Sequence, residues 1–146
     1  MYKRILVPVD GSATSNKALV AALQMARESG GRVRIVHALD ELAYLSGFEF
    51  SADILQVARQ YATKVLDDAL DVAKSAGIPA DTRLVEQAGQ RLGEVVAAAA
   101  RDWEADLVVV GTHGRRGVGR VMLGSGAEQV LRLAPVPVLA VRGAAD

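Results

Sequence analysis

Cysteine is absent from the chain, and aromatic side chains are rare. Without cysteine there are no disulfides, thiolate nucleophiles or cysteine-based zinc sites. Aromatic residues make up 4% of the chain and hydrophobic residues 51%, so a core must be built from Val, Leu, Ile and Ala. A chain without cysteine is compatible with a reducing compartment, and we expect a cytoplasmic location.

The chain also lacks an excess of charge of either sign and a long apolar run. Lys plus Arg and Asp plus Glu number 17 each, which makes the formal net charge zero. A chain with no basic excess is a poor candidate for binding nucleic acid through its overall field. Asp10 interrupts the apolar run after the basic N-terminus too early for a signal peptide, and no run approaches the length of a membrane-spanning helix. We therefore expect neither nucleic acid nor membrane as a partner.

What the sequence does contain is a regular alternation of strand and helix patterns. The length of 146 residues fits one domain, and we expect residues 1–146 to form it. Residues 5–9 and 106–111 are nearly continuous apolar runs, typical of strands covered on both faces. Residues 14–29 carry apolar side chains at helical spacing, ended by a glycine pair. The expected strands are residues 5–9, 33–39, 82–85, 106–111 and 135–141, and the expected helices are residues 14–29 and 54–76, a helix after Gly89, and residues 125–133.

This alternation predicts an α/β fold: a single open parallel sheet with helices on both faces, joined by right-handed crossovers. Residues 40–50 lack clear periodicity and are expected to form a loop or a short helix. Ile54, Val57, Ala58 and Tyr61 then restart the helical spacing. Five strands and four helices result, and no linker or internal repeat divides them.

Two polar or glycine-rich segments, residues 10–12 and 111–126, directly follow strands. In open sheets of this kind, ligands bind at the carboxyl ends of the strands, where the winding direction switches. Glycines in the second segment let the backbone approach a ligand and aim N–H groups at an anion. Ser125 stands at the expected start of a helix, where free N–H donors and the helix dipole favour phosphate, and three nearby arginines add positive charge. The combination predicts a polyphosphate site.

The glycine-rich segment matches none of the common phosphate or nucleophile motifs. No glycine is followed by Lys-Ser or Lys-Thr, so the Walker arrangement is absent. The dinucleotide fingerprint fails because Gly117 and Gly119 lack a third glycine at the required place. Leu123 occupies the position where a nucleophile elbow around Ser125 requires glycine. We therefore assign no catalytic residue.

Plain structural explanations fit several of the same residues. Ser125 and Glu128 have the spacing of a capping box, in which each satisfies an orphan backbone donor. Asp10 followed by Gly11 is a strong turn former. The arginines fit solvated loop charges, and a single histidine such as His37 fits a structural role. A cap at Ser125 is compatible with phosphate binding, so both interpretations stay open there.

The spacing Gly111-x-x-Gly114, nine residues, then Gly124-Ser125 resembles the glycine motif of ATP-binding universal stress proteins. The similar segments are spread over the whole chain and keep the family's order. The resemblance implies a Rossmann-like sheet of the adenine nucleotide alpha hydrolase-like type, with strand order 3-2-1-4-5. The further segments that are similar to the family are residues 5–12, 105–111 and 137–141.

The resemblance also implies a nucleotide site and assigns roles to its residues. Asp10 would lie near the ribose or hold a phosphate-bound metal such as Mg²⁺. Pro8 and Val9 would flank the adenine, and His37 and Ala38 would form the other wall of the adenine slot. The residues implied to bind the phosphates are Gly111, Gly114, Gly124 and Ser125, with the backbone of Gly126 and Ala127. From their positive charge, we add Arg115 and Arg116 as candidate phosphate ligands.

The function implied by the resemblance is ATP binding in a homodimeric stress-response sensor or regulator, with dimers formed through the last strand. Such a protein would not be a dedicated enzyme, although slow ATP hydrolysis is compatible with the site. Gly126 and Ala127 depart from the family pattern, because a larger apolar residue and a hydroxyl are common there. Two alternatives therefore stay open: a protein-interaction module with a vestigial nucleotide site, and a cyclic-AMP binder.

Overall fold

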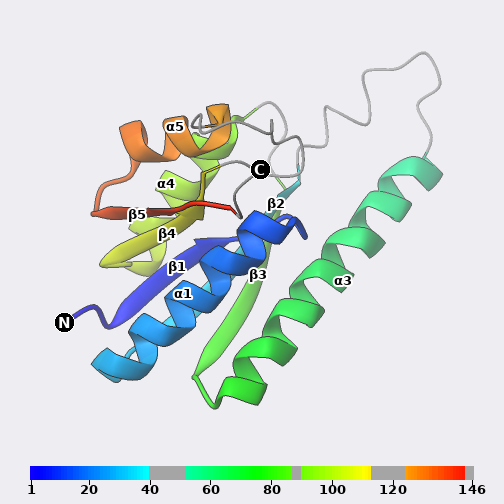
Figure 1. The fold of residues 1–146 in the computed structure, drawn as a ribbon. Coiled ribbons are helices and arrows are strands. Elements are labelled where there is room, and N and C mark those ends of the chain that lie inside the picture. The colour runs from blue at the N-terminus through cyan, green and yellow to red at the C-terminus, as the bar shows by residue number, and fades with distance from the viewer. Residues whose placement is uncertain (40–51, 87–89, 113–123, 144–146) are drawn as a thin grey trace.

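The computed structural model describes residues 1–39, 52–86, 90–112 and 124–143. In this part of the chain, five strands alternate with four helices (Figure 1). The elements are β1 (Arg4–Pro8), α1 (Ala13–Ser29), β2 (Arg32–Leu39), α3 (Ala52–Ala76), β3 (Ala80–Glu86), α4 (Leu92–Trp103), β4 (Leu107–Gly111), α5 (Ser125–Leu133) and β5 (Val138–Val141).

The strands form one parallel sheet in the order β3-β2-β1-β4-β5, as expected. The chain runs outward from β1 through β2 to β3, and then returns to β4 and continues to β5. The winding direction therefore switches between β1 and β4. In Figure 1, α1 and α3 lie on one side of the sheet, and α4 and α5 lie on the other. The loops that follow β1 and β4 consequently lead to opposite faces of the sheet.

The central strands are buried on both faces because a helix layer covers each side. In β1, Ile5 and Val7 pack in a cluster with α1 and α3, whereas Leu6 packs with α4 and α5. In β4, Val109 belongs to the first cluster and Val108 to the second. This alternation explains why these strands read as continuous apolar runs.

The helix boundaries follow from local chemistry. Gly30 ends α1 in the left-handed conformation with φ 71°, and Gly77 follows α3 with φ 73°. Both positions suit glycine, because a side chain is strained at positive φ. The long helix that was expected over residues 54–76 begins two residues earlier, at Ala52.

The buried face of α3 differs from the apolar spacing that starts it. Ile54 and Val57 are 47% and 63% exposed, whereas Leu55 and Ala58 are buried. The buried stripe continues through Ala62, Val65, Leu66, Ala69 and Ala73. Several members of this stripe are alanines, which let the helix approach the sheet closely.

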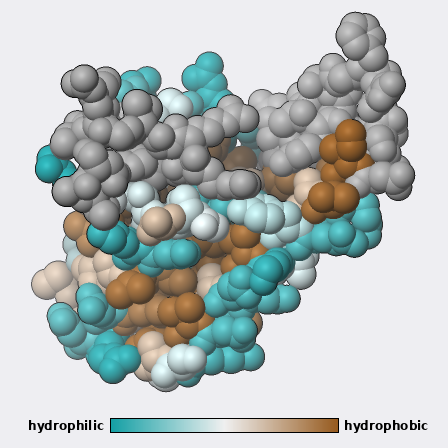
Figure 2. All heavy atoms as spheres, turned by 45° about the vertical axis from the view of Figure 1, so that its right-hand side comes forward, coloured by the Kyte–Doolittle hydropathy of each residue, from teal (hydrophilic) through white to brown (hydrophobic). Residues whose placement is uncertain are grey.

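An apolar groove of about 380 Å³ separates the outer surfaces of α1 and α3. Val20 and Val72 line it and are 46% and 44% exposed. Figure 2 shows apolar side chains gathered over this part of the surface. Arg27 also lines the groove and donates a hydrogen bond to the carbonyl oxygen of Ala76, which ties the two helices together.

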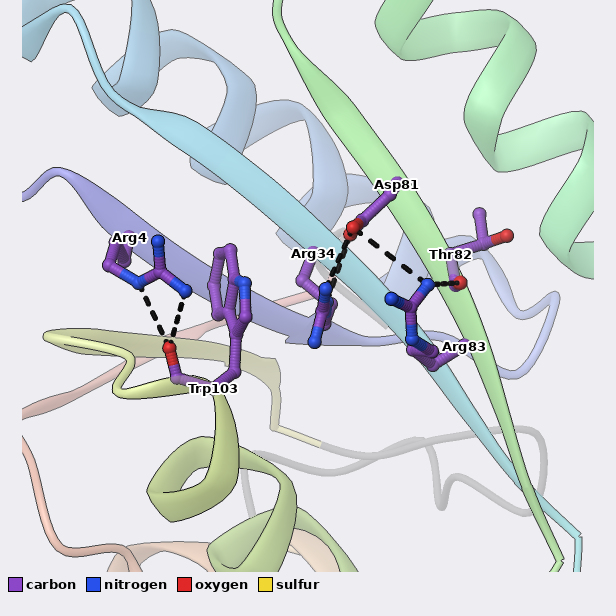
Figure 3. Close-up of polar contacts among 6 residues, drawn as sticks. All are labelled: Arg4, Arg34, Asp81, Thr82, Arg83 and Trp103. Atoms are coloured by element: carbon purple, nitrogen blue, oxygen red, sulfur yellow. Dashed lines mark hydrogen bonds and ion pairs between the residues drawn. The ribbon is translucent and has the colours of Figure 1, made fainter.

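Charged side chains stand on β2 and β3 on the side of the sheet that carries α4. Arg34 donates two hydrogen bonds to the Asp81 carboxylate, Nε to Oδ1 at 2.9 Å and Nη2 to Oδ2 at 2.8 Å. The ring of Trp103 lies between Arg4 and Arg34, whose guanidinium carbons are 4.4 and 4.9 Å from its centroid (Figure 3). The hydrogen bonds from Arg34 hold the pKa of Asp81 below its usual range despite partial burial, and Arg83 adds to this effect.

Candidate functional site

The turn that leaves β1 is built by its own polar side chains. The Ser12 N–H donates to Asp10 Oδ1 at 2.9 Å, and Gly11 between them has φ 85°. Ser12 is also the N-cap of α1, because its Oγ accepts from the Ser15 N–H at 3.1 Å. The turn predicted from Asp10 and Gly11 is confirmed. One oxygen of the Asp10 carboxylate is therefore engaged in shaping this turn.

Two side chains from other elements hold the same turn. His37 of β2 is 8% exposed, and its Nδ1 lies 2.8 Å from the carbonyl oxygen of Val9. A carbonyl oxygen only accepts, so Nδ1 must carry the proton in this contact. The Tyr61 hydroxyl of α3 donates to the carbonyl oxygen of Asp10 at 3.1 Å. In the sequence, Tyr61 is only one member of a helical pattern, and its distance from Asp10 along the chain leaves no local signal of this contact.

Gly111, at the end of β4, packs directly against the first turn of α1. A Cβ at this position would lie 2.6 Å from Thr14 Cγ2 and 3.1 Å from the Thr14 carbonyl oxygen. Gly126 is less restricted, since a Cβ there would lie 2.8 Å from Leu92 Cδ2, the flexible end of a side chain. Contacts within the protein are therefore enough to require a small residue at Gly111. The sequence alone had suggested a ligand as the reason for glycine at position 111.

The start of α5 is joined to the end of β4. The Gly124 N–H donates to the carbonyl oxygen of Thr112 at 2.6 Å, and the Thr112 N–H donates to Val141 of β5 at 2.9 Å. These bonds bring together the two ends of the glycine-rich segment. Three of its predicted site residues, Gly114, Arg115 and Arg116, lie outside the described residues, as do His113 and Arg120.

The capping box predicted for Ser125 and Glu128 is wrong. Gly124 is the N-cap, with φ −66° and ψ 157°, so Ser125 is the first residue of α5. The Glu128 N–H bonds to the carbonyl oxygen of Gly124 at 2.9 Å, and its carboxylate pairs with Arg132 at 3.0 Å. The helix begins one residue earlier than the box requires. Ser125 is exposed at the first turn of the helix.

The structure gathers the remaining predicted residues at the carboxyl edge of β2, β1 and β4. Pro8 ends β1 and pairs with Val36, and Ala38 lies near the end of β2. The side chains of Val9 and His37 face the α1 and α3 side, where Val9 is 4% exposed in the core. At Val9 and His37, the main chain is therefore what the edge offers to a ligand.

The chemistry of this edge suits an anion. The N–H groups of Ser125, Gly126 and Ala127 have no acceptor within the helix, because the first turn of any helix leaves its N–H groups without one. The helix dipole adds partial positive charge at the same place. The described residues contain no group of three or more His, Asp or Glu side chains that would hold a metal ion. Likewise, no helix in the described part of the chain is long and apolar enough to cross a membrane.

Comparisons with known proteins agree with the fold and cover nearly the whole chain. The profile of the universal stress protein family matches residues 1–142. A universal stress protein of Thermus aquaticus is 35% identical over 142 residues, which are 97% of this chain and all of that protein. A crystal structure from the same family in Burkholderia pseudomallei is 36% identical, with a TM-score of 0.77 over 95% of each chain. A universal stress protein solved in complex with cAMP is 28% identical, with a TM-score of 0.70 over 98% of each chain. The chain belongs to the universal stress protein family.

Proposed function

We propose that this universal stress protein binds ATP at the carboxyl edge of its sheet and acts as a nucleotide-dependent sensor or regulator in the stress response. The observation that carries the proposal is the start of α5, which is bonded to the end of β4 at the switch point through Gly124 and Thr112. An anion-binding helix terminus at a switch point is the usual phosphate site of open α/β sheets. The family match and the cAMP complex of a relative support an adenine nucleotide.

The described residues divide naturally between the parts of the nucleotide. The N–H groups of residues 125–127, together with the Ser125 hydroxyl, would hold the phosphates, whereas the Gly124 N–H already donates to Thr112. The main chain of residues 8–10 and Ala38 would flank the adenine. Asp10 would lie near the ribose or a phosphate-bound Mg²⁺, and its Oδ1 already accepts a hydrogen bond from the Ser12 N–H. A single carboxylate fits Mg²⁺ bound mainly through phosphates and water.

The affinity of α5 for phosphate is tested by a substitution that leaves the helix intact. Ser125→Asp places a negative charge at the proposed phosphate position, yet an acidic residue at a helix N-terminus is favourable for the helix itself. We expect the Kd for ATP to rise about 10- to 100-fold, since opposed like charges cost several kcal/mol, while the melting temperature stays level or rises. Ser125→Asn is the neutral control. Calorimetric titration of the nucleotide-free protein measures the affinity, and equal Kd values for both variants and the wild type would reject the site.

Mass spectrometry of small molecules released from freshly purified, denatured protein tests which nucleotide the protein takes. Stoichiometric ATP or ADP supports the proposal, and cAMP that displaces ATP at equal concentration would favour the cyclic nucleotide. A protein-interaction module without nucleotide is the second candidate. The packing of Gly111 on Thr14 favours it, because this contact requires a small residue without a ligand. Protein that is isolated empty and ignores added ATP would support this second candidate.

We also propose that the protein forms a homodimer through β5 and that ATP turnover is slow or absent. β5 is an edge strand, and Leu139 within it is 39% exposed. Leu131 and Leu133 of the neighbouring α5 are 42% and 43% exposed. Apolar side chains beside an open strand edge are suited to pairing with a second copy. Steady phosphate release that Asp10→Asn abolishes would instead establish an ATPase.

A further inference from the structure

Side chains from β2 and α3 donate hydrogen bonds to the main chain of the turn between β1 and α1. We propose that Tyr61 and His37 are positioning residues: they set the orientation of the main chain at residues 9–11 for nucleotide binding, and Tyr61 couples α3 to the site. This inference rests on the proposed function. Neither side chain needs to touch the nucleotide, because both act through carbonyl groups of the turn.

Tyr61 contacts the turn at two consecutive residues. Its hydroxyl donates to the Asp10 carbonyl oxygen at 3.1 Å, and a Cβ on Gly11 would lie only 2.6 Å from the same hydroxyl oxygen. Gly11 has φ 85°, a backbone conformation that residues with a side chain rarely adopt. The absence of a side chain at Gly11 thus allows both the sharp turn and the close approach of Tyr61.

His37 performs the equivalent task one residue earlier. The N–H of Val9 donates to the carbonyl oxygen of Val36 in β2 at 2.8 Å. The carbonyl oxygen of Val9 accepts a hydrogen bond from the His37 ring at 2.8 Å. The rings of His37 and Tyr61 meet edge to face, with centroids 6.4 Å apart and planes at 71°. The carbonyl groups of Val9 and Asp10, which follow β1, therefore each accept a hydrogen bond from a side chain. The rings of the two donors also contact each other.

This arrangement preorganises the main chain of residues 9–11 for a ligand. Binding through main-chain groups costs less conformational entropy when those groups already have their bound orientation. When one donor is removed, the carbonyl group must bond to water or change its orientation, which alters the main chain of the turn. Because coupling between two sites is reciprocal, a nucleotide that stabilises the turn also stabilises the contact with α3.

The first half of α3 is suited to respond to this coupling. Its buried residues Leu55 and Ala58 do not join the main core but form a small separate cluster with Leu39, against which Leu84 packs. The second half of the helix, from Val65 to Ala73, is packed in the main core. The Tyr61 contact with Asp10 lies between the two halves and adds a polar anchor to the more weakly packed one.

The experiment compares Tyr61→Phe, which removes only the hydroxyl, with Tyr2→Phe, which makes the same change next to the amino end of β1. Hydrogen exchange of the Ser12 amide, measured by NMR without nucleotide, reports the turn because this N–H donates to Asp10. For Tyr61→Phe alone, we expect faster exchange at Ser12 and an ATP Kd raised about 2- to 10-fold, the loss of one hydrogen bond. We also expect ATP to protect the amides of residues 54–61 in the wild type and to protect them less in Tyr61→Phe.

His37 is tested by a pair of variants that differ in one donor. Asn places an amide N–H close to the position of Nδ1, so His37→Asn should keep ATP binding nearer to the wild type than His37→Leu does. Unchanged Ser12 exchange in Tyr61→Phe, or an affinity loss that Tyr2→Phe shares, would overturn the inference. Wild-type protein that binds no ATP would overturn the proposed function alone, because Ser12 exchange in nucleotide-free protein still decides whether Tyr61 positions the turn.

Discussion

Gly111 ends β4 against α1 in a space that admits no side chain. We expect Gly111→Ala to lower the free energy of unfolding by about 1–3 kcal/mol, the usual cost of overpacking, because its Cβ would lie 2.6 Å from Thr14 Cγ2. Adding Thr14→Ser removes that methyl group and should restore part of the loss. Recovery should stay incomplete, since the Thr14 carbonyl oxygen would still lie 3.1 Å from the new Cβ. Urea denaturation of the two single variants and the double variant measures this coupling.

Asp81 gives the fold a dependence on acid pH. Its pKa in the folded state is lowered below the ordinary 3.8, first by hydrogen bonds from Arg34 and then by nearby arginines. The unfolded chain therefore takes up the proton first, so the contribution of Asp81 is complete above pH 3.8 and is lost as pH falls through the lower folded-state pKa. The free energy of unfolding of Asp81→Asn should fall less steeply over this window. Parallel slopes for wild type and variant between pH 5 and 2.5 would contradict this.

At the scale of single residues, the sequence predicts what depends on near neighbours. The turn at Asp10 and Gly11 was predictable because a short acceptor and a glycine act over two residues. The role of Tyr61 was not, because the fold brings it to Asp10 across 51 positions. The glycine at position 111 was assigned to a ligand, and only the folded chain reveals the contact with Thr14.

Two serines at the starts of helices should respond differently to the same substitution. Ser12 caps α1 through its side chain, and we expect Ser12→Ala to lower the free energy of unfolding by about 1 kcal/mol. Ser125 follows the N-cap Gly124, so Ser125→Ala should change it by less than about 0.5 kcal/mol. Thermal and urea unfolding of both variants decide the matter. An equal cost at the two positions would mean that Ser125 does cap α5.

The contact between α4 and α5 depends on Gly93. The backbone N–H of Gly93 donates a hydrogen bond to Gln129 Oε1 at 3.2 Å. A Cβ on Gly93 would lie 2.3 Å from the Cβ of Gln129 and 2.7 Å from the backbone carbonyl carbon of Gln129. Gly93→Ala must therefore move one helix, and we expect it to cost about 2 kcal/mol or more. Gly126→Ala is the control, because its Cβ would meet only the flexible end of Leu92 and should cost less. A smaller loss for Gly93→Ala in urea denaturation would contradict this packing.

At the scale of elements, periodicity predicts that a helix forms better than which face it buries. The apolar spacing over residues 14–29 predicted a helix with one buried face, and Leu19 and Leu23 of α1 are both buried. In α3 two apolar stripes overlap, and spacing alone does not select between Ile54 and Leu55. The folded chain buries the stripe rich in alanine. The one-residue error at α5 has a similar origin, since Gly124 takes the N-cap conformation without any side chain to mark it.

For the whole molecule, the alternation of strands and helices was enough to predict a parallel sheet with two helix layers. The order of the strands came only from the family resemblance, because alternation allows several orders. The order has a functional consequence. It places β1 between β2 and β4, so the turn that follows β1 lies beside the end of β4, the strand that leads to α5. It also leaves β3 and β5 at the edges of the sheet.

If the dimer forms through β5, a charged side chain on this edge strand should prevent the two copies from pairing. Leu139→Lys adds a charge to β5, where Leu139 is 39% exposed, and should convert the dimer to a monomer because a buried unpaired charge is costly. Val72→Lys makes a matched change in the groove between α1 and α3, where Val72 is 44% exposed, and should leave the dimer intact. Sedimentation equilibrium at several concentrations measures both. If Val72→Lys alone dissociates the dimer, the copies meet through α1 and α3 instead, and a monomeric wild type would remove the dimer from the proposed function while leaving the nucleotide site to its own test.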